Sequence, residues 1–505
     1  MSKYRNISHY NYIIYNNKVY YIKLNFMQNT NLLKIISSTV YLCDTFYCIV
    51  FRNQKFEYCF TIFYTHLIVY IYFHIMVAFG LLFMLQTWAG QTVGFTIGNF
   101  STDIMTLYYQ AVYGGTFESN NDLIQKFLSI LSIGFVVGFL LGSLTVSIWI
   151  KVIGYKKTAF VGSAICVIFY AAGCVAVNEY YLLVMRILTG YGSQVMANTI
   201  VVLVGEHAET HQRGLLGVMF QVQVCLGILL ATIVLYLIRM FETSYNCWWM
   251  TFASSLIWPT LAFITLFFIP DTKPRETKDI HFKEVFTRKY TKILINCILL
   301  GVLQMGTGVN GVLLYSTQTF NSVFNHKLSS VFGALILNTV NFLSTLVALI
   351  FIERLGRKIL LFGGSLICCI ALVCLIINYS LSTSNTALLL FASVLFIIGY
   401  EIGPGPVFYV YASELLPAQA KGIFTTILNC FNHIPNIFVM YLFPVLVITK
   451  EWLPYVTYLI CTILTGAILF FLSPETKGKS QEEIDSIMLI NGKKNNNLEI
   501  ECAQV

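Results

Sequence analysis

The chain has 505 residues, of which 57% are hydrophobic and only 11% are charged, whereas about a quarter of the residues in a soluble domain carry charge. This composition excludes a large soluble domain. The net charge of +8 does not indicate a nucleic-acid partner, because the Lys and Arg residues gather in the loops between apolar blocks.

The apolar residues form blocks of about twenty, long enough to cross a hydrocarbon core of about 30 Å. In lipid, the backbone N–H and C=O groups of each block must form hydrogen bonds within the block, so we predict that each block is a helix. The sequence therefore predicts an all-α membrane protein. Its twelve predicted spans are residues 77–98, 127–150, 158–177, 180–203, 215–237, 248–269, 293–316, 329–352, 359–379, 387–411, 422–446 and 453–473.

The region before the first span does not fit this pattern cleanly. Residues 59–75 are apolar enough for a thirteenth span, and residues 1–58 are rich in Tyr, Ile and Asn. We predict that residues 1–75 are an extension outside the functional fold, with translation starting at or near Met76. In the alternative, a thirteenth helix would place the N-terminus outside the cell.

Basic residues are distributed unevenly between the two sets of loops. The predicted outer loops hold only Lys126, Arg239, Lys327 and Lys450, and the other loops hold most of the Lys and Arg residues. Positive loops stay in the cytosol. The loop at residues 271–290 and the C-terminal tail are therefore predicted to be cytosolic.

Three short motifs recur in the same order, about two hundred residues apart. The pairs are residues 153–156 with 355–358, 205–214 with 413–422, and 268–273 with 472–477. Three matches in register predict two six-helix bundles of the same topology, the parallel repeat of major facilitator transporters. The predicted parts of the chain after the extension are residues 76–270, 271–290, 291–475 and 476–505.

The repeated motifs place acidic and basic side chains at the cytosolic ends of helices. Ion pairs between neighbouring helices would hold the inner side shut and break when it opens. In the alternative, the basic residues only anchor the loops inside the cell. The candidate gating residues are Glu206, Arg213, Glu353, Arg354, Arg357, Glu414 and Lys421.

An ordered set of motifs resembles a known family. The motifs are residues 308–310 and 315–317 in the seventh predicted helix, 353–358, 401–406 and 474–478. At these helix positions the set resembles the sugar porters, and within them the facilitative glucose transporters of animals, over about residues 77–480. The resemblance implies passive hexose transport across the plasma membrane by alternating access.

The resemblance also implies a sugar site inside the membrane. Amide side chains both donate and accept hydrogen bonds, as sugar hydroxyls do, and an aromatic face covers the C–H side of the ring. Polar side chains at this depth need a wet cavity or a hydrogen-bonded neighbouring helix. The implied ligands are Gln221, Gln304, Asn310, Asn338, Glu401 and Asn436, with Tyr409 where the family usually has a tryptophan.

Local geometry supports some of these assignments. Gln221 and Gln223 lie two residues apart, so they point to nearly opposite helix faces, and the resemblance selects Gln221. Three glycines around Asn310 weaken the seventh helix, which would allow Gln304 and Asn310 to reach one sugar. Pro404 and Pro406 are predicted to loosen the tenth helix as a hinge for the inner gate.

Departures from the family pattern leave the sugar and the efficiency of transport open. Met305 stands where a second glutamine is usual, and His433 stands where a tryptophan is usual. The central loop at residues 271–290 is also much shorter than the family's helical cytosolic domain.

The mode of action has three alternatives. Residues 90–94 of the first helix contain no acid, which favours passive uniport over proton symport, although Glu401 could titrate. A non-transporting sugar sensor is disfavoured by the short tail at residues 478–505. We find no phosphate loop, nucleophile–base pair or metal cluster, so the sequence predicts no enzyme and no cofactor. The predicted partners are the hexose and the lipid bilayer, and the sequence does not give the oligomeric state.

Overall fold

The computed structural model describes residues 11–15, 18–22, 80–98, 108, 111–113, 122–175, 177–207, 213–241, 248–269, 282–314, 327–380 and 385–489. The chain forms two compact units, Met1–Val77 and Ala78–Val505. In the first unit, β1 (Asn11–Tyr15) and β2 (Lys18–Ile22) form an antiparallel hairpin. The stretch 59–75, predicted as a possible thirteenth span, lies outside the described residues.

The described part of the second unit is helical. Its first half holds a helix at residues 80–98, α4 (Asp122–Ile153), α5 (Tyr155–Gly173), α6 (Glu179–His207), α7 (Arg213–Phe241), α8 (Trp249–Ser255) and α9 (Ile257–Phe268). The short 3-10 helices Phe282–Phe286 and Arg288–Tyr290 follow within the central loop.

The second half has the same succession of helices. It comprises α10 (Thr291–Gly306), α11 (Val309–Leu314), α13 (Lys327–Leu355), α14 (Arg357–Ser380), α15 (Thr386–Ile402), α16 (Pro404–Glu414), the 3-10 helix Ala418–Ala420, α17 (Lys421–Thr449), α18 (Leu453–Leu472) and α19 (Gln481–Met488). Three pairs are single spans interrupted by a break: α8 with α9, α10 with α11, and α15 with α16.

Ten segments of the described chain are long and apolar enough to cross a membrane. Together with the helix at residues 80–98 and with α5, they occupy the twelve predicted blocks. The predicted all-α membrane fold is therefore confirmed for the second unit.

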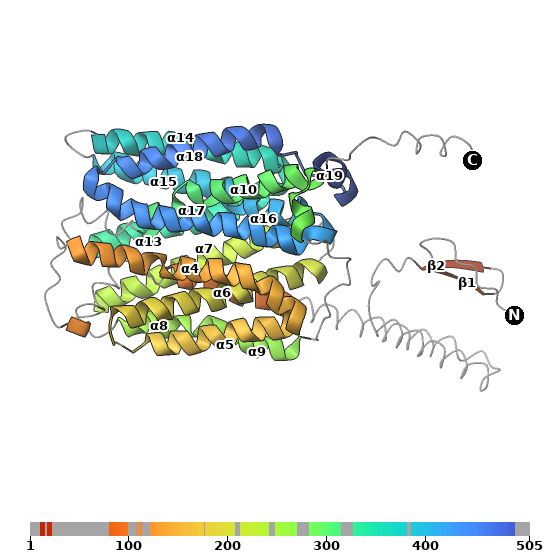
Figure 1. Cartoon of the computed structure of the whole chain (residues 1–505), viewed down its shortest axis with the longest axis horizontal. Coiled ribbons are helices and arrows are strands. Elements are labelled where there is room, and N and C mark those ends of the chain that lie inside the picture. Colours follow the sequence, from red (N-terminus) through yellow and green to blue (C-terminus); the bar gives the residue numbers. More distant parts are fainter. Residues whose placement is uncertain are drawn as a thin grey trace. The chain divides into compact units, whose positions relative to one another are not determined.

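The helices of the second unit gather into two bundles (Figure 1). Helices α4, α5, α6, α8 and α9 lie together, and α10, α14, α15, α17 and α18 lie together. The two groups meet through α7, which packs against α13 and α16, and through α4, which packs against α17. A cavity between the bundles would thus be lined by both halves of the chain.

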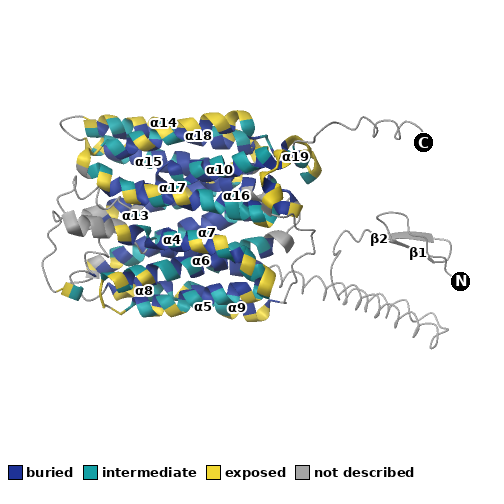
Figure 2. Cartoon of the chain, viewed as in Figure 1, coloured by how far each residue is buried: buried dark blue, intermediate teal, exposed yellow. Residues whose placement is uncertain are grey.

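Burial follows the pattern of a protein solvated by lipid. Figure 2 shows exposed residues on the outer faces of the bundles and buried residues inside. Large apolar side chains are among the exposed ones, for example Phe471 at 84% and Ile148 at 62%. On a water-soluble surface such patches would mark an interface, whereas here the acyl chains of a bilayer cover them.

Glycines at equivalent places in the two halves confirm the repeat. Gly154 precedes α5 with φ 84°, and Gly356 precedes α14 with φ 92°, a conformation that favours glycine. Eight residues later, Gly162 and Gly364 let α5 and α14 approach the next helix. A Cβ on Gly162 would lie 2.7 Å from Met196 N, and one on Gly364 would lie 2.5 Å from Gly399 O. Small residues at such contacts let membrane helices pack closely.

We expect Gly364→Val to destabilise the fold by about 1–3 kcal/mol, because the added side chain would meet backbone that cannot move away locally. Thermal unfolding of the purified protein in detergent measures this loss. Gly363→Val is the matched control, since a Cβ there meets nothing within 4 Å. Equal melting temperatures for the two variants would contradict the close packing of α14 against α15.

Candidate functional site

The seventh span breaks at its glycines, as predicted. Helix α10 ends at Gly306 and α11 begins at Val309. Between them Gly308 has φ 87°, and a Cβ there would lie 2.2 Å from Cδ2 of Tyr458. Both the backbone angle and the space therefore require glycine at this position.

The tenth span also breaks where the prolines were predicted to loosen it. Helix α15 ends at Ile402, Gly403 intervenes, and Pro404 opens α16. Proline is tolerated at the start of a helix because its missing N–H would have no partner within the helix. The break lies between Glu401 and Tyr409, so the two side chains sit on separate helical segments.

A cavity lies between the two halves of the second unit. Six of the seven implied sugar ligands line it, and they come from α7, α10, α11, α15, α16 and α17. These six are Gln221, Gln304, Asn310, Glu401, Tyr409 and Asn436. The structure therefore brings together residues that are spread over about two hundred positions of the sequence.

Asn338 is the implied ligand that does not line this cavity. Its Nδ2 donates a hydrogen bond to Thr232 Oγ1 at 3.0 Å, which joins α13 to α7. Asn341, one turn further along α13, lines the cavity instead and is 1% exposed. Sequence analysis overlooked Asn341, although the two asparagines are three residues apart and so share one side of the helix.

The amides of the second half hold one another in place. Asn310 Nδ2 donates to Asn436 Oδ1 at 2.9 Å, and Gln304 Nε2 donates to the carbonyl of Gly405 at 3.1 Å. Asn432, a further cavity residue that sequence analysis missed, donates from Nδ2 to Gln304 Oε1. This network fixes the orientation of the amides before any ligand arrives.

Glu401 is the acidic member of the cavity lining and is 1% exposed. Its carboxylate accepts hydrogen bonds from Thr345 Oγ1 at 2.9 Å, Gln221 Nε2 at 3.2 Å and Cys225 Sγ at 3.5 Å. All three donors are neutral. Because Gln221 and Cys225 belong to α7, Glu401 links the second half to the first.

Gln223 lies away from the cavity, as its spacing from Gln221 predicts. Its Oε1 accepts a hydrogen bond from Gln91 Nε2 at 3.2 Å. A Cβ on Gly90 would lie 2.5 Å from the Cβ of Gln223. This face of α7 is therefore packed against the helix at residues 80–98.

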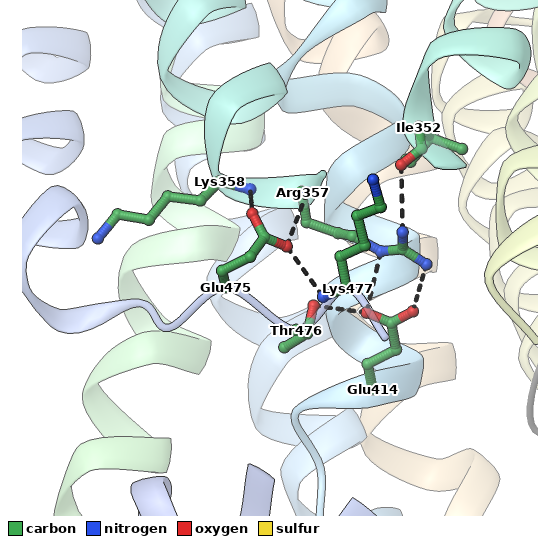
Figure 3. Close-up of polar contacts among 7 residues, drawn as sticks. All are labelled: Ile352, Arg357, Lys358, Glu414, Glu475, Thr476 and Lys477. Carbon is green, nitrogen blue, oxygen red and sulfur yellow. Dashed lines mark hydrogen bonds and ion pairs between the residues drawn. The ribbon is translucent and has the colours of Figure 1, made fainter. Parts of the chain in front are cut away.

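The charged motifs of the second half meet in one cluster (Figure 3). Arg357 binds Glu414 through both ends of its guanidinium, from Nη2 to Oε1 at 2.8 Å and from Nε to Oε2 at 3.3 Å. Thr476 Oγ1 donates to the same carboxylate at 2.6 Å. The cluster joins the ends of α14, α16 and α18, all in the second bundle.

Glu475 caps the start of α14. Its carboxylate accepts the backbone N–H groups of Arg357 at 3.0 Å and Lys358 at 2.9 Å, and that of Lys477 at 2.9 Å. Burial raises the pKa of Glu475, but these N–H donors outweigh burial and hold the pKa below its ordinary value of 4.5. The carboxylate therefore stays ionised at neutral pH.

Two more candidate gating residues lie at the ends of other helices of the second half. Arg354 is in the last turn of α13, where its carbonyl accepts a hydrogen bond from Lys477 Nζ at 2.8 Å, and Lys421 opens α17. The side chains of Glu206, Arg213 and Glu353 lie outside the described part of the chain.

At this end of the molecule the two halves touch through neutral groups. Ser147 Oγ and Thr426 Oγ1 lie 3.0 Å apart, and Asn429 Nδ2 donates to Asn198 Oδ1 at 3.3 Å. Ser147 is near the end of α4, and Thr426 is near the start of α17. The halves are thus in contact on the side that carries the charged motifs.

The comparisons with known proteins agree with this architecture. The model of the sugar (and other) transporter family matches residues 75–275 and 272–488. A mouse protein, solute carrier family 2, facilitated glucose transporter member 7, is 26% identical over 421 residues, which cover 74% of this chain and 81% of that protein. The facilitated trehalose transporter Tret1 of Bombyx mori is 32% identical over 228 residues, which cover 43% of this chain and 44% of that protein.

A solved structure shows the same fold. The proton:xylose symporter XylE, bound to 6-bromo-6-deoxy-D-glucose, aligns with a TM-score of 0.71 at 17% identity, covering 82% of this chain and 99% of that chain. The predicted major facilitator fold, with two six-helix bundles, is confirmed. Because the family model spans nearly all of the second unit, the chain belongs to the sugar (and other) transporter family.

Proposed function

We propose that this transporter carries a hexose passively across the plasma membrane by alternating access, with the sugar held in the cavity between the two bundles. The observation that carries the proposal is the gathering of amide side chains from both halves in one cavity. Gln221 and Gln194 come from the first half, and Gln304, Asn310, Asn341 and Asn436 come from the second.

The chemistry of this lining suits an uncharged sugar. Amides match hydroxyls that donate and accept at once. Neutral groups also bind without the desolvation penalty of charges, which suits a site that must release its ligand as readily as it captures it. Tyr409 and Phe220, whose ring centroids lie 5.5 Å apart, add an aromatic wall for the apolar face of a pyranose. The mouse relative, named as a glucose transporter, supports the choice of a hexose.

The orientation follows from the basic residues. The closed end of the molecule carries Lys151, Arg354, Lys358 and Lys421, and positive ends stay in the cytosol. We infer that the C-terminus is cytosolic and that the halves meet on the cytosolic side in this conformation. The sugar would then enter from outside.

The contacts also suggest how the carrier moves. Arg357, Glu414 and Glu475 tie helix ends together within the second bundle, so they favour motion of that bundle as one body. Across the halves, Ser147 with Thr426 and Asn198 with Asn429 make neutral contacts, each worth about 1 kcal/mol net. Alternating access can therefore break the contacts between bundles while each bundle stays intact.

Two observations bear on energy coupling. The polar side chains in the middle of the helix at residues 80–98 are neutral. Gln91 pairs with Gln223, and Thr92 Oγ1 donates to the carbonyl of Trp88. Proton symport is the second candidate, because Glu401 is a buried acid in the cavity and XylE is named as a proton symporter. We favour uniport because residues 90–94 of the helix at residues 80–98 contain no acid.

We expect radiolabelled hexose to enter cells that lack their own hexose carriers, down its gradient, at a rate that a proton uncoupler does not change. The physical reason is that a uniporter moves no proton together with the sugar, so the proton gradient does not drive its cycle. Accumulation against the gradient that collapses on uncoupling would replace uniport with symport. Sugar binding without any flux would instead favour the sensor alternative.

A further inference from the structure

The cavity holds a second polar group of side chains beyond the implied sugar ligands. Gln194 and Asn198 of α6 line it from the first half, and Asn429 and His433 of α17 line it from the second. We call these four residues the second polar cluster. Asn198 Oδ1 accepts hydrogen bonds from Gln194 Nε2 at 3.1 Å and from Asn429 Nδ2 at 3.3 Å, so the cluster spans both bundles.

The second polar cluster continues the face of α17 that already carries a sugar ligand. Asn429, His433 and Asn436 follow one another at intervals of four and three residues, which place them on one side of the helix. At 1.5 Å per residue, Asn429 lies about 10 Å along the axis from Asn436. One pyranose ring held at Asn436 does not span that distance, but two linked rings do.

His433 is the member of the cluster that protein contacts do not explain. It is 6% exposed, and within the described residues neither of its ring nitrogens has a hydrogen-bond partner. Buried polar groups nearly always have a hydrogen-bond partner, because a buried donor or acceptor without one costs free energy. Its ring lies 5.5 Å from that of Phe139, which also lines the cavity, so an aromatic surface adjoins the two nitrogens.

We propose that the second polar cluster is a second subsite for a hydroxyl-bearing ring, so that the transporter accepts a disaccharide as well as a monosaccharide. The first ring binds among Asn310, Asn341 and Asn436, and the second ring binds His433 and the amides of Gln194 and Asn429. Phe139 covers the apolar face of the second ring. This inference rests on the proposed sugar-transport function and names its substrate class more closely.

The test uses the purified full chain in liposomes, with radiolabelled glucose, maltose, trehalose and sucrose as separate probes. We expect at least one disaccharide to be taken up and to compete with glucose. His433→Phe keeps the ring and removes both nitrogens, and Asn429→Ala removes one amide. Each change should lower the affinity for that disaccharide about 5- to 150-fold. The affinity for glucose should fall less, so the ratio of disaccharide affinity to glucose affinity should also fall.

His433→Gln restores a donor and an acceptor and should recover part of the lost disaccharide affinity. It also keeps the test valid if the Phe variant does not fold. Gln223→Ala is the matched control outside the cavity, and it should leave both affinities as in the wild type. If glucose is carried while no disaccharide is carried or competes, the second subsite is overturned and the transport function stands.

Two further results separate the alternatives. An equal loss of glucose and disaccharide affinity in His433→Phe and Asn429→Ala would assign the cluster to closure between the bundles, which overturns the subsite. Absence of uptake for all four sugars in properly folded protein would overturn the proposed transport function itself.

Discussion

Replacing Asn310 with Ala is expected to weaken hexose binding about 5- to 150-fold. Asn310 lies just after the break at Gly308 and lines the cavity, where its Nδ2 donates to Asn436 Oδ1 at 2.9 Å. The substitution removes a donor and an acceptor while the sugar hydroxyls remain buried. A lost hydrogen bond of this kind costs about 1–3 kcal/mol, at about 1.4 kcal/mol per tenfold change in affinity.

Binding of radiolabelled hexose to purified protein measures this effect directly. Gln223→Ala is the control, because Gln223 packs against the helix at residues 80–98 and pairs with Gln91. The amounts of folded protein must be matched, since a folding defect would mimic a loss of binding. Normal affinity in Asn310→Ala, together with weak binding in Gln223→Ala, would show that the cavity assignment is wrong.

Removing the carboxylate of Glu414 is expected to destabilise the protein by about 3–5 kcal/mol. The Arg357 side chain is 6% exposed and that of Glu414 is 18% exposed, with 2.8 Å between Nη2 and Oε1. Glu414→Ala removes the counter-charge that contacts both ends of the buried guanidinium, and breaking such a pair costs far more than the pair contributes net. The expected result is a large drop in the thermal unfolding temperature in detergent.

The double variant Arg357→Met with Glu414→Leu separates the pair's charge from its packing. Replacing both members of a buried pair by apolar side chains is often nearly neutral, so this variant should recover most of the stability. Lys477→Ala is an exposed control, because the substitution removes a side-chain hydrogen bond to the carbonyl of Arg354 and keeps the backbone N–H that donates to Glu475. A melting temperature of Glu414→Ala equal to that of the wild type would rule out the ion pair as a structural tie.

The fold could be predicted from the sequence because its signals are local. Block length and hydropathy placed the last span at residues 453–473, and α18 covers Leu453–Leu472. The breaks at Gly308 and Gly403 were likewise foreseen from glycines and prolines, which act on the backbone where they stand. The repeat could be predicted because three motifs recur in the same order at a nearly constant spacing.

Parts of the site could not be predicted because they depend on how helices rotate and how deep they sit. Asn338 and Asn341 are three residues apart on one side of α13, and only packing decides which of them faces α7 and which faces the cavity. The contact of Asn198 with Asn429 joins residues from different halves, and no local pattern records such a pair. His433 was noted as a departure from the family, but its lack of a hydrogen-bond partner is visible only in three dimensions.

The most direct test of sugar transport through this cavity is the initial rate of radiolabelled glucose uptake into liposomes that contain the purified full chain. We expect uptake well above that of empty liposomes, inhibited by excess unlabelled glucose and sharply reduced by Asn310→Ala at equal amounts of folded protein. Uptake no faster than in empty liposomes, or uptake that Asn310→Ala leaves unchanged, would contradict the account.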